Sequence, residues 1–241
     1  MLEGLCEWGA GQWEGFAKEF TLNFIRGDRW RYLWNGLGIT LLVAFSAVLL
    51  GAFLGFVVAL IRTGHERNGR LRFPNFLCNV YLTVIRGTPM VVQLLICYFV
   101  IFAALDNKVL VAVVAFGVNS GAYVAEIIRA GISSIDVGQM EAGRSLGLTY
   151  MGTMRHIILP QAIRNVLPAL GNEFIVLLKE TSVAGYIALQ DLTKGGDIIR
   201  SQTYSAFMPY FAVAGIYLAL VLLFTRLLAK LERKLRQDAR N

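Results

Sequence analysis

The chain has 241 residues, of which 56% are hydrophobic and only 16% are charged, and its formal net charge is +7. A composition this apolar excludes an ordinary soluble domain and indicates an integral membrane protein. In such a protein the positions of the basic residues report on orientation, so we expect no nucleic-acid partner.

The first 33 residues carry several acidic side chains instead of the basic start and apolar run of a signal peptide. Their aromatic residues, Trp8 and Trp13 among them, are typical of the headgroup level of a bilayer. We therefore expect residues 1–33 to lie on the membrane as an amphipathic segment. A disordered terminus is the alternative.

Four stretches without a charged residue have about the length that a spanning helix needs: 36–61, 87–105, 109–125 and 201–225. A fifth stretch, 162–189, contains Glu173, Lys179 and Glu180. An ionisable side chain near a bilayer centre costs at least about 2.5 kcal/mol, so we expect these three to face protein or a water-filled cavity. The predicted spans are 35–61, 87–105, 109–130, 162–189 and 206–228, within a transmembrane domain at 34–230 that precedes a basic tail at 231–241.

These spans predict an all-α polytopic membrane protein with about five transmembrane helices. Most of the 23 Lys and Arg residues lie in the turn after the first span, the loop after the third and the tail after the fifth. By the positive-inside rule, the C-terminus is then cytoplasmic and the N-terminus lies outside. Basic residues just before Trp34 oppose this weakly, and an N-terminal segment lying on the membrane would reconcile them.

The loop at 131–161 is longer than most connections and is predicted to hold two short helices. Asp136 can cap the first helix in a capping-box arrangement with Gln139, and Gly147 suits its left-handed end. Thr149 starts the second helix, and Pro160 is expected to bend the chain toward the next span. We expect these two helices to form a rigid element on the cytoplasmic face at which a partner docks. The alternative is an ordinary interfacial loop.

In the same loop Glu141, Ala142 and Gly143 are followed by Gly147 and then by the run Ile157 to Pro160. These residues and their spacing resemble the EAA loop of ABC-importer permeases. Gly143 stands where alanine is usual, which lowers helix propensity but leaves room for close packing. Flanking motifs are similar to the polar amino-acid branch of that family, which includes histidine, glutamine and arginine permeases: RGTP at 86–89, GAYVAEIIRAGI at 121–132, ILPQAIRNVLPALGNEFI at 158–175 and LLKETS at 177–182.

This resemblance implies a type I importer permease of the bacterial plasma membrane with a cytoplasmic coupling helix. The implied partners are a cytoplasmic ATP-binding-cassette ATPase dimer, a second permease copy or paralogue, and an extracellular or periplasmic amino-acid-binding protein. The chain contains no G-x-x-x-x-G-K-[ST] phosphate loop, so ATP and magnesium belong to the ATPase, and we expect no enzyme activity and no cofactor here. The implied ATPase-coupling residues are Gln139, Glu141, Ala142, Gly143, Ser145, Leu146 and Gly147.

Polar residues within the spans are the candidates for a substrate path, because intramembrane polar groups are costly unless paired or used. They are Asn119, Ser120, Tyr123, Glu126, Asn172, Glu173, Lys179 and Glu180. The spacing of Asn119, Tyr123 and Glu126 places them on one helix face. Two structural alternatives stay open: Glu126 can pair with Arg129, and Lys179 with Glu180. Gln93 could line the pore or bond a neighbouring backbone.

Two other protein classes compete with a permease. A stand-alone proton-coupled carrier would use Glu173 and Lys179 as a charge relay, but such carriers usually show an internal repeat and more spans. In a membrane-embedded enzyme, His65 and His156 would be the candidates, and both fall in predicted cytoplasmic loops without paired ligands. The three cysteines are odd in number and lack ligand spacing, so they predict neither disulfides nor a metal site.

Overall fold

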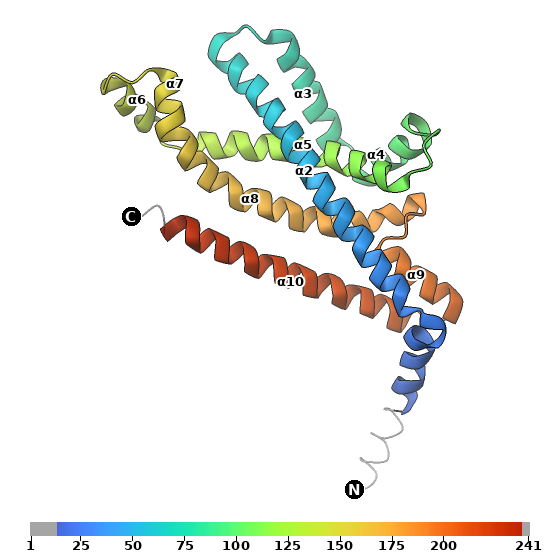
Figure 1. Ribbon diagram of the computed structural model, residues 1–241. Helices are drawn as coiled ribbons and strands as arrows, with labels where there is room; N and C mark the ends of the chain where they lie inside the picture. The colour runs from blue at the N-terminus through green and yellow to red at the C-terminus, as the bar shows by residue number, and fades with distance from the viewer. Residues whose placement is uncertain (1–13, 238–241) are drawn as a thin grey trace.

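The computed structural model describes residues 14–237, and all its regular elements in that range are helical (Figure 1). Trp8 and Trp13 lie outside the described residues. The described part of the N-terminal segment is helical and ends in the short turns η1 (Thr21–Ile25) and η2 (Arg26–Asp28). Phe24 is buried there in a cluster with α9, so this part of the segment packs on the body of the protein.

Helix α2 (Trp30–Asn68) contains the first predicted span and packs along α5 (Lys108–Ser133). Small residues permit this close approach. A Cβ atom on Gly51 would lie 2.8 Å from the Ser120 side chain, and one on Gly55 would lie 2.6 Å from Val124. The stripe formed by these two glycines is therefore a packing face within the chain.

The predicted span at 87–105 is not one continuous helix. Helix α3 (Arg72–Gly87) occupies most of the predicted turn, and only α4 (Met90–Ile96) and the π-helical turn η3 (Cys97–Ile101) follow it within the apolar window. The two parts meet at an angle of 111°. The break lies at Thr88 and Pro89, both extended, because proline disfavours helical geometry at the residue before it. Hydropathy detects apolar length but not this interruption.

The second half of the chain supplies two further long helices. They are α8 (Leu159–Glu180), which continues as the 3-10 turn η5 (Thr181–Ile187), and α10 (Phe207–Gln237), with α9 (Leu192–Thr203) between them. Within the described residues, α2, α5 and α10 are long and apolar enough to cross a membrane, and the bent pair α3 and α4–η3 could be a fourth span. Helix α8 is not among them, so five crossings stay a prediction.

Different short helices lie at the two ends of the molecule, and a core lies between the long helices. At one end, α9 lies beside the start of α2 and of α10, and the short helices α6 (Val137–Ser145) and α7 (Tyr150–Thr153) project from the other end (Figure 1). A core between α2, α4, α5, α8 and η5 contains the fully buried side chains of Leu94, Phe116 and Leu177. Only 6% of the apolar window of α10 is buried inside the protein, so most of this helix faces away from the other helices.

Candidate functional site

Residues directly beside the short helix α6 (Val137–Ser145) determine where it begins and ends. The Asp136 carboxylate accepts a hydrogen bond from the Gly138 amide at 2.6 Å and so caps the first turn. Gly147 has φ +84, and the amides of Leu148 and Gly147 donate to the carbonyls of Gly143 (3.1 Å) and Arg144 (3.0 Å). This is a Schellman ending, so both predicted boundaries of the helix are present.

One face of α6 is anchored and the rest is exposed. Gly143 is buried, and a Cβ atom there would lie 2.5 Å from Cγ2 and 2.8 Å from Oγ1 of Thr153, which is itself fully buried. Glycine at this position therefore lets α6 pack directly on the next helix. The other predicted coupling residues are all exposed: Gln139, Glu141, Ala142, Ser145, Leu146 and Gly147. Leu146 is an apolar side chain that is 82% exposed.

The helix that begins after Thr149 does not end at Pro160. Thr149 caps α7 (Tyr150–Thr153) by accepting from the Gly152 amide at 3.1 Å, and the chain continues through the π-helical turn η4 (Met154–Ile158) directly into α8. Pro160 falls in the first turn of α8 and has no amide hydrogen, and the wider π-helical turn η4 directly precedes it. Figure 1 shows the run changing direction between α7 and α8 without a break, so α6 is mounted on an extension of α8.

Three of the predicted substrate-path residues are buried and lie beside the half-buried Gln93. We call Gln93, Asn119, Ser120 and Glu173 the buried polar cluster. The Ser120 hydroxyl donates to Glu173 Oε1 at 2.9 Å, which joins α5 to α8. The Asn119 amide donates to Gln93 Oε1 at 3.0 Å, which joins α5 to α4. Ser120 is 0%, Asn119 4% and Glu173 9% exposed, so in this arrangement they are packed between helices and do not face an open cavity.

Gln93 holds the broken helix together. Its amide nitrogen donates to the Ile85 carbonyl at 2.7 Å, to Thr88 Oγ1 at 2.8 Å and to the Thr88 carbonyl at 3.1 Å. The two carbonyls lack helical donors at the break, because Pro89 has no amide hydrogen for Ile85 and the Val92 amide bonds Pro89 instead of Thr88. Unpaired backbone groups are costly in an apolar medium. Of the two roles open for Gln93, the structure therefore gives it the bond to a neighbouring backbone.

Replacing Gln93 by leucine is expected to lower the free energy of unfolding by about 1–3 kcal/mol, because the carbonyls at the break lose their donor. Reversible unfolding of the purified chain in mixed micelles measures this. Ser201→Ala, which removes one exposed hydrogen bond to Ile198, is the control and should change much less. Equal stability of Gln93→Leu and wild type would contradict the role of Gln93.

Glu126 connects two helices near one end of α5. It accepts from Arg129 at 2.8 Å, as one alternative predicted, and also from Arg62 of α2 at 2.6 Å. The second pair was missed because Arg62 and Glu126 lie far apart in sequence. Glu126 thus ties α2 to α5 and is accounted for by these two partners.

The remaining predicted path residues do not come together. Tyr123 is 39% exposed and lies under the Arg86 guanidinium, 5.7 Å from its ring centre. Asn172 and Lys179 are exposed, and Lys179 and Glu180 form none of the ion pairs found among the described side chains. Within residues 14–237, no group of three His, Cys, Asp or Glu side chains is arranged to hold a metal ion.

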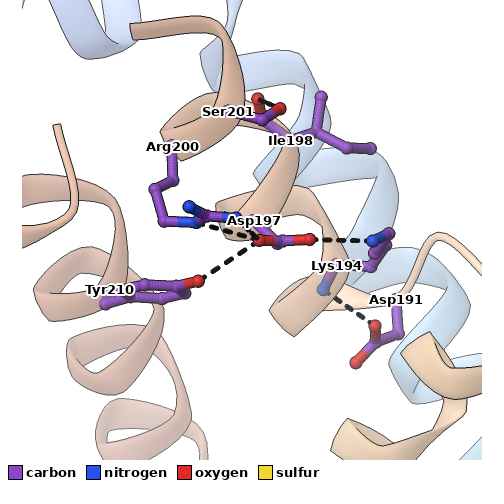
Figure 2. A network of polar contacts seen from close by, with 7 residues as sticks. All are labelled: Asp191, Lys194, Asp197, Ile198, Arg200, Ser201 and Tyr210. Atoms are coloured by element: carbon purple, nitrogen blue, oxygen red, sulfur yellow. Dashed lines mark hydrogen bonds and ion pairs between the residues drawn. The ribbon is translucent and has the colours of Figure 1, made fainter. Parts of the chain in front are cut away.

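A second polar network, which sequence reasoning did not identify, fastens α9 at the opposite end (Figure 2). Asp197 accepts from Lys194 at 2.7 Å, from Arg200 at 2.7 and 3.0 Å, and from the Tyr210 hydroxyl of α10 at 3.3 Å. Asp191 caps α9 through the amides of Thr193 and Lys194. The i, i+3 spacing of Lys194, Asp197 and Arg200 was the available signal.

The pKa values of two acids in this network are shifted in opposite directions by different causes. Hydrogen bonds from Lys194 and Arg200 lower the pKa of Asp197 from 3.8 to about 2. Burial raises the pKa of Asp191, although the hydrogen bonds it accepts oppose the shift. Asp197 therefore stabilises the fold fully above about pH 4 and loses this contribution as the pH falls toward 2.

The pH dependence can be read from the variant Asp197→Asn. Its melting temperature should lie about 2–4 °C below that of wild type at pH 6, since partly exposed pairs of this kind contribute at most about 1 kcal/mol. The difference should shrink between pH 4 and 2, because wild-type Asp197 becomes protonated there. Asp191 is present in both proteins, so its titration does not contribute to the difference in melting temperature. A difference that stays constant from pH 6 to 2 would contradict the assignment.

Residues 47–237 match the family model described as the binding-protein-dependent transport system inner membrane component. The chain belongs to this family. The resemblance to ABC-importer permeases predicted from the loop around Glu141 is thereby confirmed. The match includes α5, α6, α7 and α8, so the anchored α6 and the buried polar cluster are features of an inner-membrane transport component.

The chain matches relatives that are named as permeases, and each match covers nearly the whole length of the relative. It is 38% identical over 207 residues to the putative glutamine transport system permease GlnP of Rickettsia prowazekii, covering 85% of this chain and 93% of the relative. It is 38% identical over 210 residues to the arginine transport system permease ArtQ of Bacillus subtilis, covering 86% and 94%. With GlnP of Escherichia coli the identity is 36% over 214 residues, covering 86% and 97%.

Two solved structures share the fold. A crystal structure of an amino acid ABC transporter with histidines superposes with a TM-score of 0.79 at 45% identity, covering 85% of this chain and 94% of that one. The inward-facing methionine transporter MetNI gives a TM-score of 0.67 at 21% identity, with the same coverage. The second likeness supports the fold alone, and both agree with a permease architecture.

Proposed function

We propose that this chain is the membrane-spanning permease subunit of an ATP-driven importer of polar or charged amino acids. The observation that carries the proposal is the mounting of α6. A capped helix with an exposed surface packs through Gly143 on α7, and α7 continues into α8, which holds Glu173 of the buried polar cluster. A push on α6 from outside the chain is thus transmitted to the middle of the transmembrane region. The named glutamine and arginine permeases support the substrate class.

The energy source lies on a partner in this proposal. ATP and magnesium bind a cytoplasmic ATPase dimer that contacts α6, because the sequence has no phosphate loop of its own. Two permease chains, identical or paralogous, enclose the path, and an extracellular or periplasmic binding protein delivers the amino acid. The end that carries α6 and the basic tail is cytoplasmic, and the N-terminus is outside.

Transport then requires the buried polar cluster to open. Closure of the ATPase dimer moves α6 and α8 against α2 and α5, which are tied together by Glu126 and Arg62. Separation of α8 from α5 breaks the bond between Ser120 and Glu173 and presents both groups to the amino acid. Asn119 and Tyr123 on α5, with Asn172, Lys179 and Glu180 on α8, are the neighbouring candidates along the path.

Association with an ATPase tests the docking role of α6. Affinity purification of the chain from its own membranes is expected to yield a protein that mass spectrometry identifies as an ATP-binding-cassette ATPase, in a fixed ratio. Leu146→Glu places a charge on the exposed apolar contact and should reduce that ratio at least about tenfold, at unchanged permease yield. Tyr204→Glu, at a 96% exposed site at the opposite end, is the control. Unchanged ATPase recovery with Leu146→Glu would contradict the docking role.

A further inference from the structure

A cavity of about 640 Å³ lies between the first turns of α8 and the last turns of α10. The two helices are in close contact further along, at Gly171 and Leu228, and they leave this space nearer to α6. Arg164 on α8 and Glu232 on α10 both line the cavity. Arg164 is nine positions before Glu173, about 13 Å along the helix, so the cavity is separate from the buried polar cluster.

The cavity presents opposite charges that do not neutralise each other directly. Neither Arg164 nor Glu232 takes part in any ion pair among the described side chains. Both are partly buried. A guanidinium and a carboxylate that line one cavity without pairing leave both charges available to a ligand.

Amide groups beside them are oriented by bonds to the protein. The Asn165 nitrogen donates to the Ser134 hydroxyl at 2.8 Å, and the Gln161 nitrogen donates to the Ile157 carbonyl at 2.8 Å. Their carbonyl oxygens are therefore available as acceptors. Ile135 and Leu235 add apolar surface to the lining.

We infer that this cavity binds a free α-amino acid, with its carboxylate on Arg164 and its ammonium on Glu232 and an amide oxygen. The planar guanidinium matches a carboxylate in a bidentate geometry, and an ammonium has three protons for the remaining acceptors. The cavity has room for polar side chains of different length, with Ile135 and Leu235 in contact with their methylene groups. The inference rests on the proposed function for the cytoplasmic position of this end and for the import that occupancy slows.

Occupancy has a mechanical consequence. The bound amino acid bridges α8 and α10 close to the point where α8 continues into η4 and α7, the helices on which α6 is mounted. An interaction that ties these helices in one arrangement opposes their movement during the transport cycle. Amino acid accumulated inside the cell therefore slows its own import.

Direct binding is the first test. The purified permease–ATPase complex, without binding protein or nucleotide, should bind radiolabelled glutamine or arginine saturably. Arg164→Gln and Glu232→Gln should each weaken this component at least about tenfold, since each removes charge-assisted hydrogen bonds, and Arg164→Lys should recover part of it. Arg233→Gln removes the same charge as Arg164→Gln but lies on α10 outside the cavity lining, so it should not change this binding. Glu173→Gln should also retain the saturable binding to the cavity. Equal binding by wild type and both cavity variants would overturn the inference.

Ligand analogues keep the test valid even if a variant folds poorly. Wild type should bind the amino acid at least about tenfold more tightly than the matching amine without a carboxylate or the matching acid without an ammonium. A phospholipid headgroup such as phosphoethanolamine carries the same pair of charges. If phosphoethanolamine binds and the amino acids do not, the cavity is a lipid site and the inference is wrong.

Sealed vesicles give the transport readout. With ATP inside and binding protein outside, unlabelled amino acid in the lumen should reduce the initial rate of labelled import several-fold in wild type but not in Arg164→Gln. Import that proceeds normally but ignores the lumenal amino acid would contradict this inference alone. Absence of ATP-driven import with an empty lumen would instead contradict the proposed function.

Discussion

Gly143→Val is expected to reduce ATP-driven import at least about tenfold while the chain is still inserted and stable enough to purify. The Cβ atom alone would lie 2.5 Å from Thr153 Cγ2, and the branched side chain would add two more methyl groups. Thr153 is fully buried and cannot turn away. Overpacking of this kind costs about 1–3 kcal/mol, which displaces α6 from α7 and uncouples it from α8.

A compensating pair makes the Gly143 prediction specific. Gly143→Ala should impair import moderately, and Gly143→Ala combined with Thr153→Ala should restore most of it, because the second change removes the two nearest atoms and leaves only Ile157 Cδ1 at 3.1 Å. Initial rates of import and of ATP hydrolysis, measured in the same vesicles, separate lost coupling from lost protein. Gly215→Ala, at a glycine with open space around it, is the control. Wild-type import by Gly143→Val would exclude the proposed packing role.

Glu173→Gln is expected to reduce import of a cationic amino acid at least about tenfold and import of glutamine less. The neutral amide keeps the size of the side chain and can still bond Ser120, so packing between α5 and α8 is preserved. What is lost is the negative charge that the open path would offer to a cationic substrate.

Competition measurements distinguish a substrate role for Glu173 from a structural one. A ratio of arginine to glutamine import that falls in Glu173→Gln, with equal amounts of protein in the vesicles, supports contact with the substrate. Glu66→Gln, on an exposed residue of α2, is the matched control. Unchanged rates and unchanged preference would remove Glu173 from the substrate path.

Local signals were sufficient where a few neighbouring residues decide the structure. Asp136, Gly147 and Thr149 fixed the ends of α6 and the start of α7, because capping depends on side chains within three or four residues. The apolar windows likewise located α2, α5 and α10, since length and hydropathy are properties of one segment.

Features that depend on distant contacts could not be predicted in this way. The bond between Ser120 and Glu173 and the pair of Arg62 with Glu126 join residues more than fifty positions apart. The bend between α3 and α4 was missed although Pro89 signals it locally, because the charge-free window continued through it. Its stability depends on Gln93, whose partners become visible only once the chain is folded.

The proposed role of this chain is to form a path for amino acids that is driven by a separate ATPase. It is tested most directly by uptake of labelled glutamine or arginine into sealed vesicles containing the chain, its co-purified ATPase and the binding protein. We predict uptake that requires ATP and binding protein and that is unaffected by collapse of a proton gradient. Uptake driven by a proton gradient in vesicles that contain this chain without any ATPase would contradict the account.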